Sequence, residues 1–378
     1  MTPRARMLAA MTSGSSELPV APLYLGLYLA PHRHGFRLEE CERFLGAADR
    51  RALGFEEDLE LRLTVERRGY GVFASPPDWC EAHLGPSRAS VEGGALVRRD
   101  GRVCWEDPAG TRHDLAAQPP ECIGTWRARR QSLADLPDQV PIGRAEDIAR
   151  AGHTALTRRI VETIGREHCA AGSVSSPFWG AYELLGFAGL MEAIHDDPDH
   201  LLAATARFVP SRLAIVEALH AAGVDMMFVE SCLESADMLS PDQFHRFSLP
   251  YLRDLLQGIH DLGLPAVLYF CGDPTDRLDD LKGLPCEALA FEEGKKGFDV
   301  DIGEVRRRVG GGKTLFGNVD VRLLRDGSAR QIEAEVVRQV REAGADGRFV
   351  VSIGSPVTLD TPPAKVDMLI EAARTISL

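Results

Sequence analysis

Lysine, paired cysteines and long apolar runs are all scarce in this chain of 378 residues. Lysine occurs only at positions 282, 295, 296, 313 and 365, which leaves few candidates for Schiff-base chemistry. No apolar run approaches the roughly twenty residues that cross a bilayer, so we expect no membrane partner. No basic stripe is present, and the formal net charge of −13 argues against a nucleic-acid partner, because phosphates are neutralised by clustered Lys and Arg.

The cysteines indicate a reducing compartment. Eight of them are spread along the chain without a Cys-x-x-Cys pair, at positions 41, 80, 104, 122, 169, 232, 271 and 286. In a chain of this length, that distribution is typical of free thiols. The segment from Met1 to Val20 also lacks the continuous apolar core of a signal peptide. We therefore expect a cytoplasmic protein.

The composition predicts one large globular domain after a short tail. Hydrophobic residues make up 44% of the chain and charged residues 26%, which is enough apolar material for a sizeable core. Residues 1–17 are polar and lack periodicity, so we expect a flexible tail there and a single domain over 18–378. Gly-Gly, Asp-Gly and Pro-Ala-Gly turn signals predict a β-hairpin excursion over about residues 90–115.

After Ala145, short apolar strands alternate with helical patterns, as in a parallel sheet. Two of the predicted helices cover 241–262, capped by Ser240, and 329–343, ending at Gly344. With two earlier segments, the predicted strands cover 23–29, 71–74, 168–174, 225–230, 266–270, 288–291, 314–316 and 349–353. Eight strands alternating with helices predict an α/β fold with a (β/α)8 TIM-type barrel.

Polar residues follow most of these strands directly. In a parallel barrel the loops after the strands build the active site, so these side chains are candidates for one shared cavity. They are Ser175, Glu230, Cys232, Glu234, Cys271, Asp273, Glu292, Asn318, Asp320 and Ser355.

Several segments together resemble one superfamily. Residues 223–273 contain an apolar strand, an acidic loop, a Ser-Pro helix start with Ser-Leu-Pro-Tyr, and a strand ending in Cys-Gly-Asp. Residues 316–320 read Phe-Gly-Asn-Val-Asp, and 354–374 include a Thr-Pro segment. Residues 176–199 add Pro-Phe and Leu-Met elements. The chain from about residue 18 onward resembles the uroporphyrinogen decarboxylase and zinc methyltransferase superfamily, most strongly after residue 170, and this resemblance implies the barrel fold.

The resemblance also implies a metal site that this sequence carries in altered form. Thiol-alkylating methyltransferases of the superfamily hold zinc with a His-x-Cys pair, often a glutamate, and a later cysteine, and the metal keeps a substrate thiol deprotonated. Here the His position is Tyr269 and the late cysteine position is Ser355. A replacement set of Cys271, Cys232 and Glu292 is chemically reasonable for zinc. The alternative is that both cysteines are small packing residues near the barrel mouth.

The remaining candidates divide by role. We predict Glu230, Tyr269, Asp273 and Asp320 as catalytic groups for proton transfer or polar contacts. Predicted substrate-binding residues are Ser175, Trp179, Asn318, Ser355, His34 and Arg37. His32, His34 and Trp179 have an ordinary packing or solvated role as their alternative.

Three functions remain open. The first is a methyl or alkyl transferase acting on a small thiol or a related nucleophile, with a corrinoid-bound methyl group as a possible donor. A corrinoid would arrive on a partner protein, since the sequence has no Asp-x-His-x-x-Gly segment. The second is a metal-free decarboxylase or lyase on a small carboxylated substrate. Arg33 and Arg37 are present, but the arginine-rich string of true uroporphyrinogen decarboxylases is not. The third is a non-catalytic binding barrel, and the resemblance implies a homodimer in each case.

Overall fold

The structure is a computed structural model of the chain. It describes residues 1–23, 63, 77–82, 84, 95–99, 102–106, 112–114, 135–140, 142–294, 297–358 and 360–376. The predicted strands at 24–29 and 71–74, together with His32, Arg33, His34 and Arg37, lie outside these residues.

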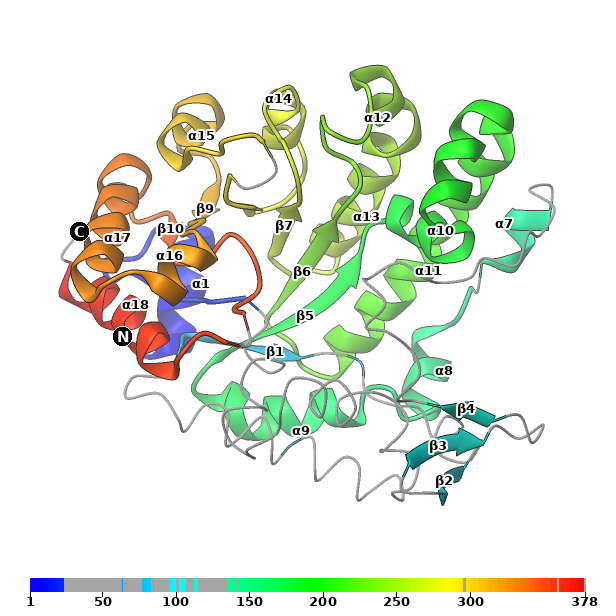
Figure 1. Cartoon of the computed structure of the whole chain (residues 1–378), viewed down its shortest axis with the longest axis horizontal. Helices are drawn as coiled ribbons and strands as arrows, with labels where there is room; N and C mark the ends of the chain where they lie inside the picture. Colours follow the sequence, from blue (N-terminus) through cyan, green and yellow to red (C-terminus); the bar gives the residue numbers. More distant parts are fainter. Residues whose placement is uncertain are drawn as a thin grey trace.

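A curled sheet of seven parallel strands forms the centre of the molecule (Figure 1). Its strands follow sequence order from one edge to the other, and each pairs in parallel with the next. The strands are β1 (Trp79–Ala82), β5 (Cys169–Ser175), β6 (Met226–Ser231), β7 (Ala266–Phe270), β8 (Ala288–Phe291), β9 (Thr314–Phe316) and β10 (Phe349–Val350). The predicted α/β class with a parallel sheet is confirmed, and three of the predicted strands, β7, β8 and β9, have the predicted bounds.

A short segment near the N-terminus joins the two edges of this sheet. Val20 bridges Val351 in parallel, and the Ala21 amide donates to the Val351 carbonyl at 2.9 Å. On the other side, the Asp78 amide donates to the Val20 carbonyl at 2.8 Å, directly before β1. Residues 19–21 therefore satisfy backbone groups of both edges, as a barrel requires. Strand β1 itself was not predicted from the sequence.

Helices follow the strands and lie outside the curled sheet (Figure 1). They cover the outer apolar face, as in other sheets whose parallel strands need crossover helices. The helices after β1 are α7 (Leu136–Gln139), α8 (Ala145–Arg150), α9 (Ala155–Thr163), α10 (Pro177–Asp196), α11 (Pro198–Ala221), α12 (Pro241–Phe247), α13 (Leu249–Asp261), α14 (Leu278–Lys282), α15 (Ile302–Val309), α16 (Val321–Asp326), α17 (Ala329–Ala343) and α18 (Pro363–Thr375).

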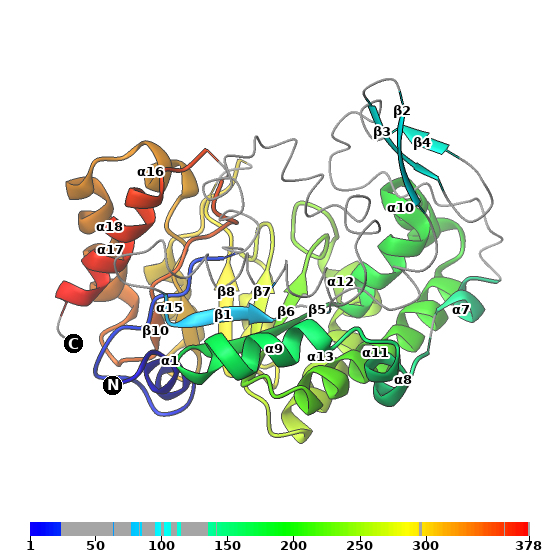
Figure 2. The same cartoon turned by 90° about the horizontal axis from the view of Figure 1, so that it is seen from below.

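The prediction of a flexible tail over residues 1–17 is wrong for most of its length. Residues Pro3–Thr12 form helix α1, with the Thr2 side chain accepting from the Ala5 amide as its N-cap. Met7 and Met11 are buried, and the helix packs against β1, β5, β9 and β10 (Figure 2). A small-residue-rich helix with only a few apolar positions has a weak periodic signal, and its stability comes from this tertiary packing.

The predicted helix over 241–262 is divided in two. Helix α12 begins with a capping box between Ser240 and Gln243, and Ser248 separates it from α13. Pro250 lies in the first turn of α13, where its missing amide hydrogen costs no intrahelical bond. Proline cannot donate to the carbonyl four residues before it and its ring crowds that carbonyl, so one continuous helix through this place is disfavoured.

Two further features complete the fold. Three short antiparallel strands, β2 (Ala95–Arg99), β3 (Arg102–Glu106) and β4 (Arg112–Asp114), form a separate sheet within the segment predicted as a hairpin excursion. Among the described residues, no helix has the length and apolar character that a membrane crossing would need.

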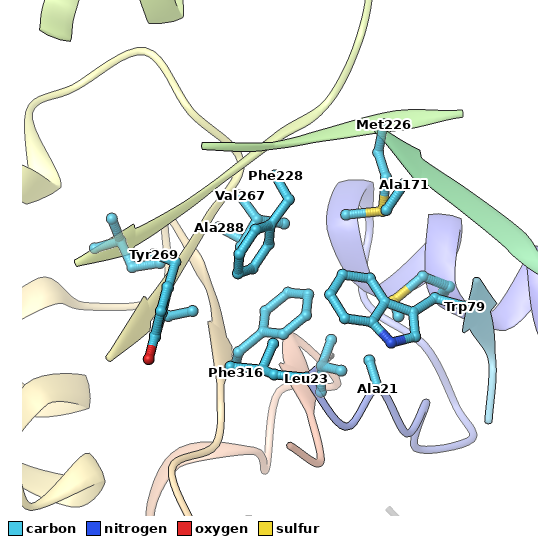
Figure 3. Close-up of a cluster of buried hydrophobic side chains, with 14 of the residues drawn as sticks. Ala21, Leu23, Trp79, Ala171, Met226, Phe228, Val267, Tyr269, Ala288 and Phe316 are labelled. Carbon is cyan, nitrogen blue, oxygen red and sulfur yellow. The ribbon is translucent and has the colours of Figure 1, made fainter. Parts of the chain in front are cut away.

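Aromatic side chains fill the interior of the curled sheet (Figure 3). Trp79 lies 5.6 Å from Phe228 and 6.1 Å from Phe316 between ring centroids, and Phe228 stacks on Tyr269 at 5.4 Å. The Trp79 indole nitrogen donates to the Pro22 carbonyl at 3.0 Å, so its polar group is satisfied inside the core. This packed layer forms the floor beneath the C-terminal ends of the strands.

Candidate functional site

The strand register brings the predicted residues into two successive rows. Ser175 is the Cα partner of Glu230, and Glu230 is the partner of Tyr269. Because side chains alternate along a strand, Glu230 and Tyr269 face the same side as Phe228 and Val267, which are interior. Two residues further along, the next row on that side contains Cys232, Cys271, Glu292 and Asn318.

Two cysteines of this second row are in direct contact. The Cys232 thiol donates to the Cys271 sulfur at 2.8 Å, and both side chains are partly exposed free thiols. The hydrogen bond from Cys232, burial, and the negative charges of Glu292 and Glu230 all raise the pKa of Cys271 well above its usual value. Two thiols in direct contact therefore lie at the mouth of the curled sheet, and the one with the raised pKa is Cys271.

Glu230 lies one row below this pair, on the same interior side of the sheet. Burial alone raises the pKa of its carboxyl to about 7. A carboxyl group with such a pKa exchanges a proton near neutral pH, which is the property of a general acid or base. Glu230 and the two cysteines thus form a cluster of proton-carrying groups at one place.

Glu292 and Asn318 hold the loops on the far side of the cluster. Glu292 Oε2 accepts from the Gly272 amide at 2.8 Å, and Asn318 Nδ2 donates to the carbonyls of Glu292 at 3.3 Å and Val300 at 2.7 Å. Gln339 from α17 donates to Asn318 Oδ1 at 3.4 Å. Both predicted residues therefore lie at the mouth, and each is tied to backbone groups there.

Tyr269 and Ser355 occupy the two positions where zinc ligands were expected in relatives. The Tyr269 hydroxyl donates to the Gly354 carbonyl at 2.8 Å, and the Ser355 hydroxyl donates to Glu293 Oε2 at 2.7 Å. Burial raises the pKa of Tyr269 well above its usual value, so its hydroxyl remains a donor. A Cβ at Gly354 would lie 2.2 Å from the Glu293 amide nitrogen, so only glycine fits here. These contacts join β7, β8 and the segment after β10.

Three other predicted residues have local structural contacts. Asp320 caps α16 and pairs with Arg322 at 2.7 Å, and these contacts lower the pKa of Asp320 despite partial burial, which raises it. The Asp273 carboxylate accepts from the Thr275 amide at 2.9 Å. Trp179 packs on Tyr182 at 4.5 Å between ring centroids, in a second apolar cluster on α10.

The contacts at the mouth place the three predicted metal donors differently. The two sulfurs touch, but Glu292 directs one oxygen at the Gly272 amide. Within the described ranges, no three His, Cys, Asp or Glu side chains are arranged so that they could share a metal ion. Two of the three predicted donors are thus brought together.

Sequence reasoning gave no role to the buried polar cluster behind Cys232. Glu234 is fully buried and accepts hydrogen bonds from the hydroxyls of Ser176 and Ser248. Burial raises the pKa of Glu234, although these hydroxyls and Arg277 act in the opposite direction. The signal in the sequence is the acidic Glu-Ser-Cys-Leu-Glu loop, followed by the Ser-Pro helix start and Ser248. Only the fold shows that the three polar groups meet.

Comparison with known proteins supports the predicted kinship. A family model described as uroporphyrinogen decarboxylase (URO-D) matches residues 131–376, which is more than half of the chain. The chain belongs to this family. Within the URO-D family, it is 26% identical over 254 residues to uroporphyrinogen decarboxylase 2, chloroplastic, of Arabidopsis thaliana, a match that covers 65% of this chain and 61% of the relative.

Other relatives match shorter segments. The uroporphyrinogen decarboxylase of Hordeum vulgare is 32% identical over 145 residues, which is 37% of this chain and 41% of that protein. The chain therefore aligns with only about two fifths to three fifths of these URO-D relatives. A solved methyltransferase from Methanosarcina mazei superposes with a TM-score of 0.67 over 99% of this chain and 98% of its own, at 18% identity. That likeness shows the shared fold.

Proposed function

We propose that this URO-D family member is a methyl or alkyl transferase acting on a small thiol or a related nucleophile. The observation that carries the proposal is the contact between Cys232 and Cys271 at the mouth of the curled sheet, with Glu230 directly below. Two soft sulfur donors beside a carboxyl group with a raised pKa suit a site that binds and deprotonates a thiol. The substrate is a small molecule, because an aromatic layer closes the interior beneath these groups.

Zinc fits the donor set in part. Cys232 and Cys271 would supply two of its ligands, and Glu292 would supply the third after releasing the Gly272 amide. When bound there, zinc would lower the pKa of a substrate thiol and leave one coordination position for it. Both cysteine thiols would lose their protons on binding, and the raised pKa of Cys271 makes that loss costly without a metal.

The remaining residues of the site would position the reactants. Glu230, whose pKa is about 7, would accept the proton of the incoming nucleophile. Tyr269 and Asn318 would hold the loops around the opening through their backbone contacts. Ser175, His34 and Arg37 remain proposed substrate contacts, and a corrinoid-carrying partner remains the proposed methyl donor.

Metal content tests the proposed ligand pair. The protein is purified without chelator, and its zinc is measured by inductively coupled plasma mass spectrometry alongside Cys271→Ala and Cys286→Ala. Cys286 is a free cysteine too, but it is buried and lies before β8, at the N-terminal end of that strand. Near-stoichiometric zinc that only Cys271→Ala removes supports the set. Equal zinc in all three proteins, or none in any, refutes it.

Group transfer is tested directly with methylcobalamin and a panel of small thiols. The change in the corrinoid spectrum reports demethylation, and mass spectrometry identifies the methylated thiol. We expect a thiol-dependent reaction that falls about 100-fold in Glu230→Gln, the usual effect of losing a general base. A rate that is independent of enzyme would contradict the proposal.

A decarboxylase is the second candidate, and the raised pKa of Glu230 is the observation that favours it. A carboxyl group that is half protonated near pH 7 could protonate the carbon that loses carbon dioxide. This reaction needs no metal. Release of carbon dioxide from small carboxylated substrates by metal-free protein, lost in Glu230→Gln and retained in Cys271→Ala, would favour it over group transfer.

A further inference from the structure

The loop that carries Cys232 has an unusual backbone. Leu233, which follows it, has φ 66°, and it is the only non-glycine residue with a positive φ in the described part of the chain. L-residues avoid this region because the Cβ atom crowds the backbone. Such a conformation persists only where surrounding contacts determine it, and it concentrates at functional sites. The turn separates Cys232 from the buried Glu234.

Glu234 is the anchor on the inner side of this turn. Its two carboxyl oxygens accept from the hydroxyls of Ser176 and Ser248. Ser176 begins α10, and its amide donates to the Glu230 carbonyl at 2.7 Å, whereas Ser248 lies at the break between α12 and α13. One carboxyl group therefore ties the β6 loop to two neighbouring places, the start of α10 and the break between α12 and α13.

Arg277 holds the main chain of the same loop. Its guanidinium is buried, donates to the Glu234 carbonyl at 2.7 Å and also to the Leu239 carbonyl, and lies 4.9 Å above the Phe244 ring. Guanidinium donors suit two carbonyl groups in a fixed geometry. The loop over 234–239 is thus fastened at both ends from the loop after β7.

The loops after β6 and β7 also interlock beside Cys271. Gly272 has φ 91°, and a Cβ there would lie 2.1 Å from Ser235 Oγ, so the two loops approach more closely than a side chain allows. The Ala236 amide donates to the Asp273 carbonyl at 3.0 Å, and the Asp273 amide donates to Asp237 Oδ1 at 3.1 Å. These bonds set the spacing of the loops that carry the two sulfurs.

We propose that Glu234 is a positioning residue that holds the strained turn at Leu233 and thereby presents Cys232 to Cys271 as a preformed dithiol. Glu234 touches neither sulfur, and it acts through the main chain between itself and Cys232. The inference concerns the geometry of the cysteine pair, and it extends the proposed function without depending on methyl transfer or zinc.

Phenylarsine oxide is a suitable probe, because one trivalent arsenic bonds to two adjacent thiols. The two S–H groups lose their protons, two As–S bonds form, and the arsenic-bound oxygen leaves as one water, so no oxidant is required. Affinity for the full-length, chelator-treated protein is measured by competition with a small dithiol, and intact mass gives the stoichiometry. One adduct is expected, absent in Cys232→Ala and in Cys271→Ala.

The variants of the anchor then test its role. We expect Glu234→Ala to weaken binding about tenfold, the usual effect of losing the preorganisation of a site, and Glu234→Gln to restore most of the affinity. The stability control is Thr314→Ala. It removes a buried hydroxyl that donates to the Ala10 carbonyl at the N-terminal end of β9, far from the cysteine pair. It should lower the melting temperature and leave arsenical affinity unchanged.

Two results would overturn the proposal. One is unchanged arsenical affinity in folded Glu234→Ala, and the other is an equal loss of affinity in Thr314→Ala. Should Glu234→Ala fail to fold, Ser248→Ala replaces it, with an expected loss of about threefold from one missing hydrogen bond. Unchanged affinity in Ser248→Ala then counts against the anchor. A preformed dithiol in a protein without transfer activity would refute the proposed function alone.

Discussion

Asp78 and Glu230 are acidic groups at opposite ends of the parallel strands, and their surroundings differ. Asp78, before β1, accepts from Arg6 at 3.0 Å, from Arg374 at 2.7 Å and from the Val20 amide at 2.7 Å. Glu230, at the end of β6, has burial as the one cause of its raised pKa. Asp78, at the N-terminal end of β1, thus has two cationic partners, whereas burial is the cause of the raised pKa of Glu230 at the C-terminal end of β6.

The N-terminal ends of the strands carry groups that stabilise the fold, and the C-terminal ends carry groups that are suited to chemistry. Arg4 pairs with Asp225 just before β6, and the buried Met7 and Met11 of α1 pack at the same N-terminal ends of the strands. The C-terminal ends of the strands instead carry the contacting thiols of Cys232 and Cys271, the Glu230 carboxyl with a pKa of about 7, and Leu233 in an unfavourable backbone conformation. Groups that are costly to maintain collect where a barrel enzyme has its active site.

Of the variants that test this difference, a replacement of Asp78 should change the free energy of unfolding most. We expect Asp78→Asn to lower the free energy of unfolding by about 3–5 kcal/mol, because two arginines lose their buried partner. Urea denaturation measures this loss. The control is Asp138→Asn, since Asp138 is 86% exposed and pairs with Arg207 at the surface. A loss for Asp78→Asn as small as that of the control would mean that the N-terminal edge is not held by this network.

Helix α1 provides the second test. Met11 is 1% exposed. We expect Met11→Ala to lower the free energy of unfolding by about 3 kcal/mol, because it leaves a cavity between α1 and the sheet. Met1 is 57% exposed, so Met1→Ala should change it by less than about 0.5 kcal/mol. Thermal or urea unfolding of both variants measures the difference. Equal small effects would mean that residues 1–17 contribute little to stability, as expected of a flexible tail.

At the C-terminal ends of the strands, replacing Glu230 should stabilise the protein, and the gain should depend on pH. Glu230 has a folded-state pKa of about 7, above its ordinary value, so stability present at low pH is lost as the pH rises through 7. Glu230→Gln removes that loss, and we expect it to be more stable than the parent by on the order of 2 kcal/mol at pH 8 and equal to it near pH 4. Urea unfolding at both pH values measures this.

The matched control is Glu333→Gln, on the exposed side of α17. It should show the same stability relative to the parent at both pH values, because its side chain is in water before and after unfolding. A gain in stability that is independent of pH in Glu230→Gln would indicate better packing rather than removal of a buried charge.

The smallest expected effect concerns the strained turn. Leu233→Gly loses side-chain packing but relieves the positive φ, so we expect a net change below about 1 kcal/mol in the free energy of unfolding. Leu262 is similarly half-buried but has φ −78°, and Leu262→Gly should cost clearly more. Urea unfolding of the two variants compares them, and equal losses would mean that Leu233 bears no strain.

The alternating pattern of the second half of the chain determined most of the fold in advance. Apolar runs of three to seven residues between helices identified the strands from β5 to β10, because buried parallel strands have this pattern. The same pattern correctly placed Glu230, Cys232, Cys271 and Glu292 at one edge. The sequence pattern alone could not reveal β1 or the packing of α1. Both segments are short, and their structure depends on contacts with the rest of the sheet.

Tertiary structure alone decided which side chains at that edge meet. The sequence supplied the acidic loop, the cysteines and the serines of the helix starts, each with an ordinary local explanation. Register and loop packing then brought the Cys232 and Cys271 sulfurs to 2.8 Å and gathered Ser176 and Ser248 around Glu234. Such contacts join residues from 14 to 58 positions apart, and their formation depends on the curvature of the whole sheet, which no local pattern encodes.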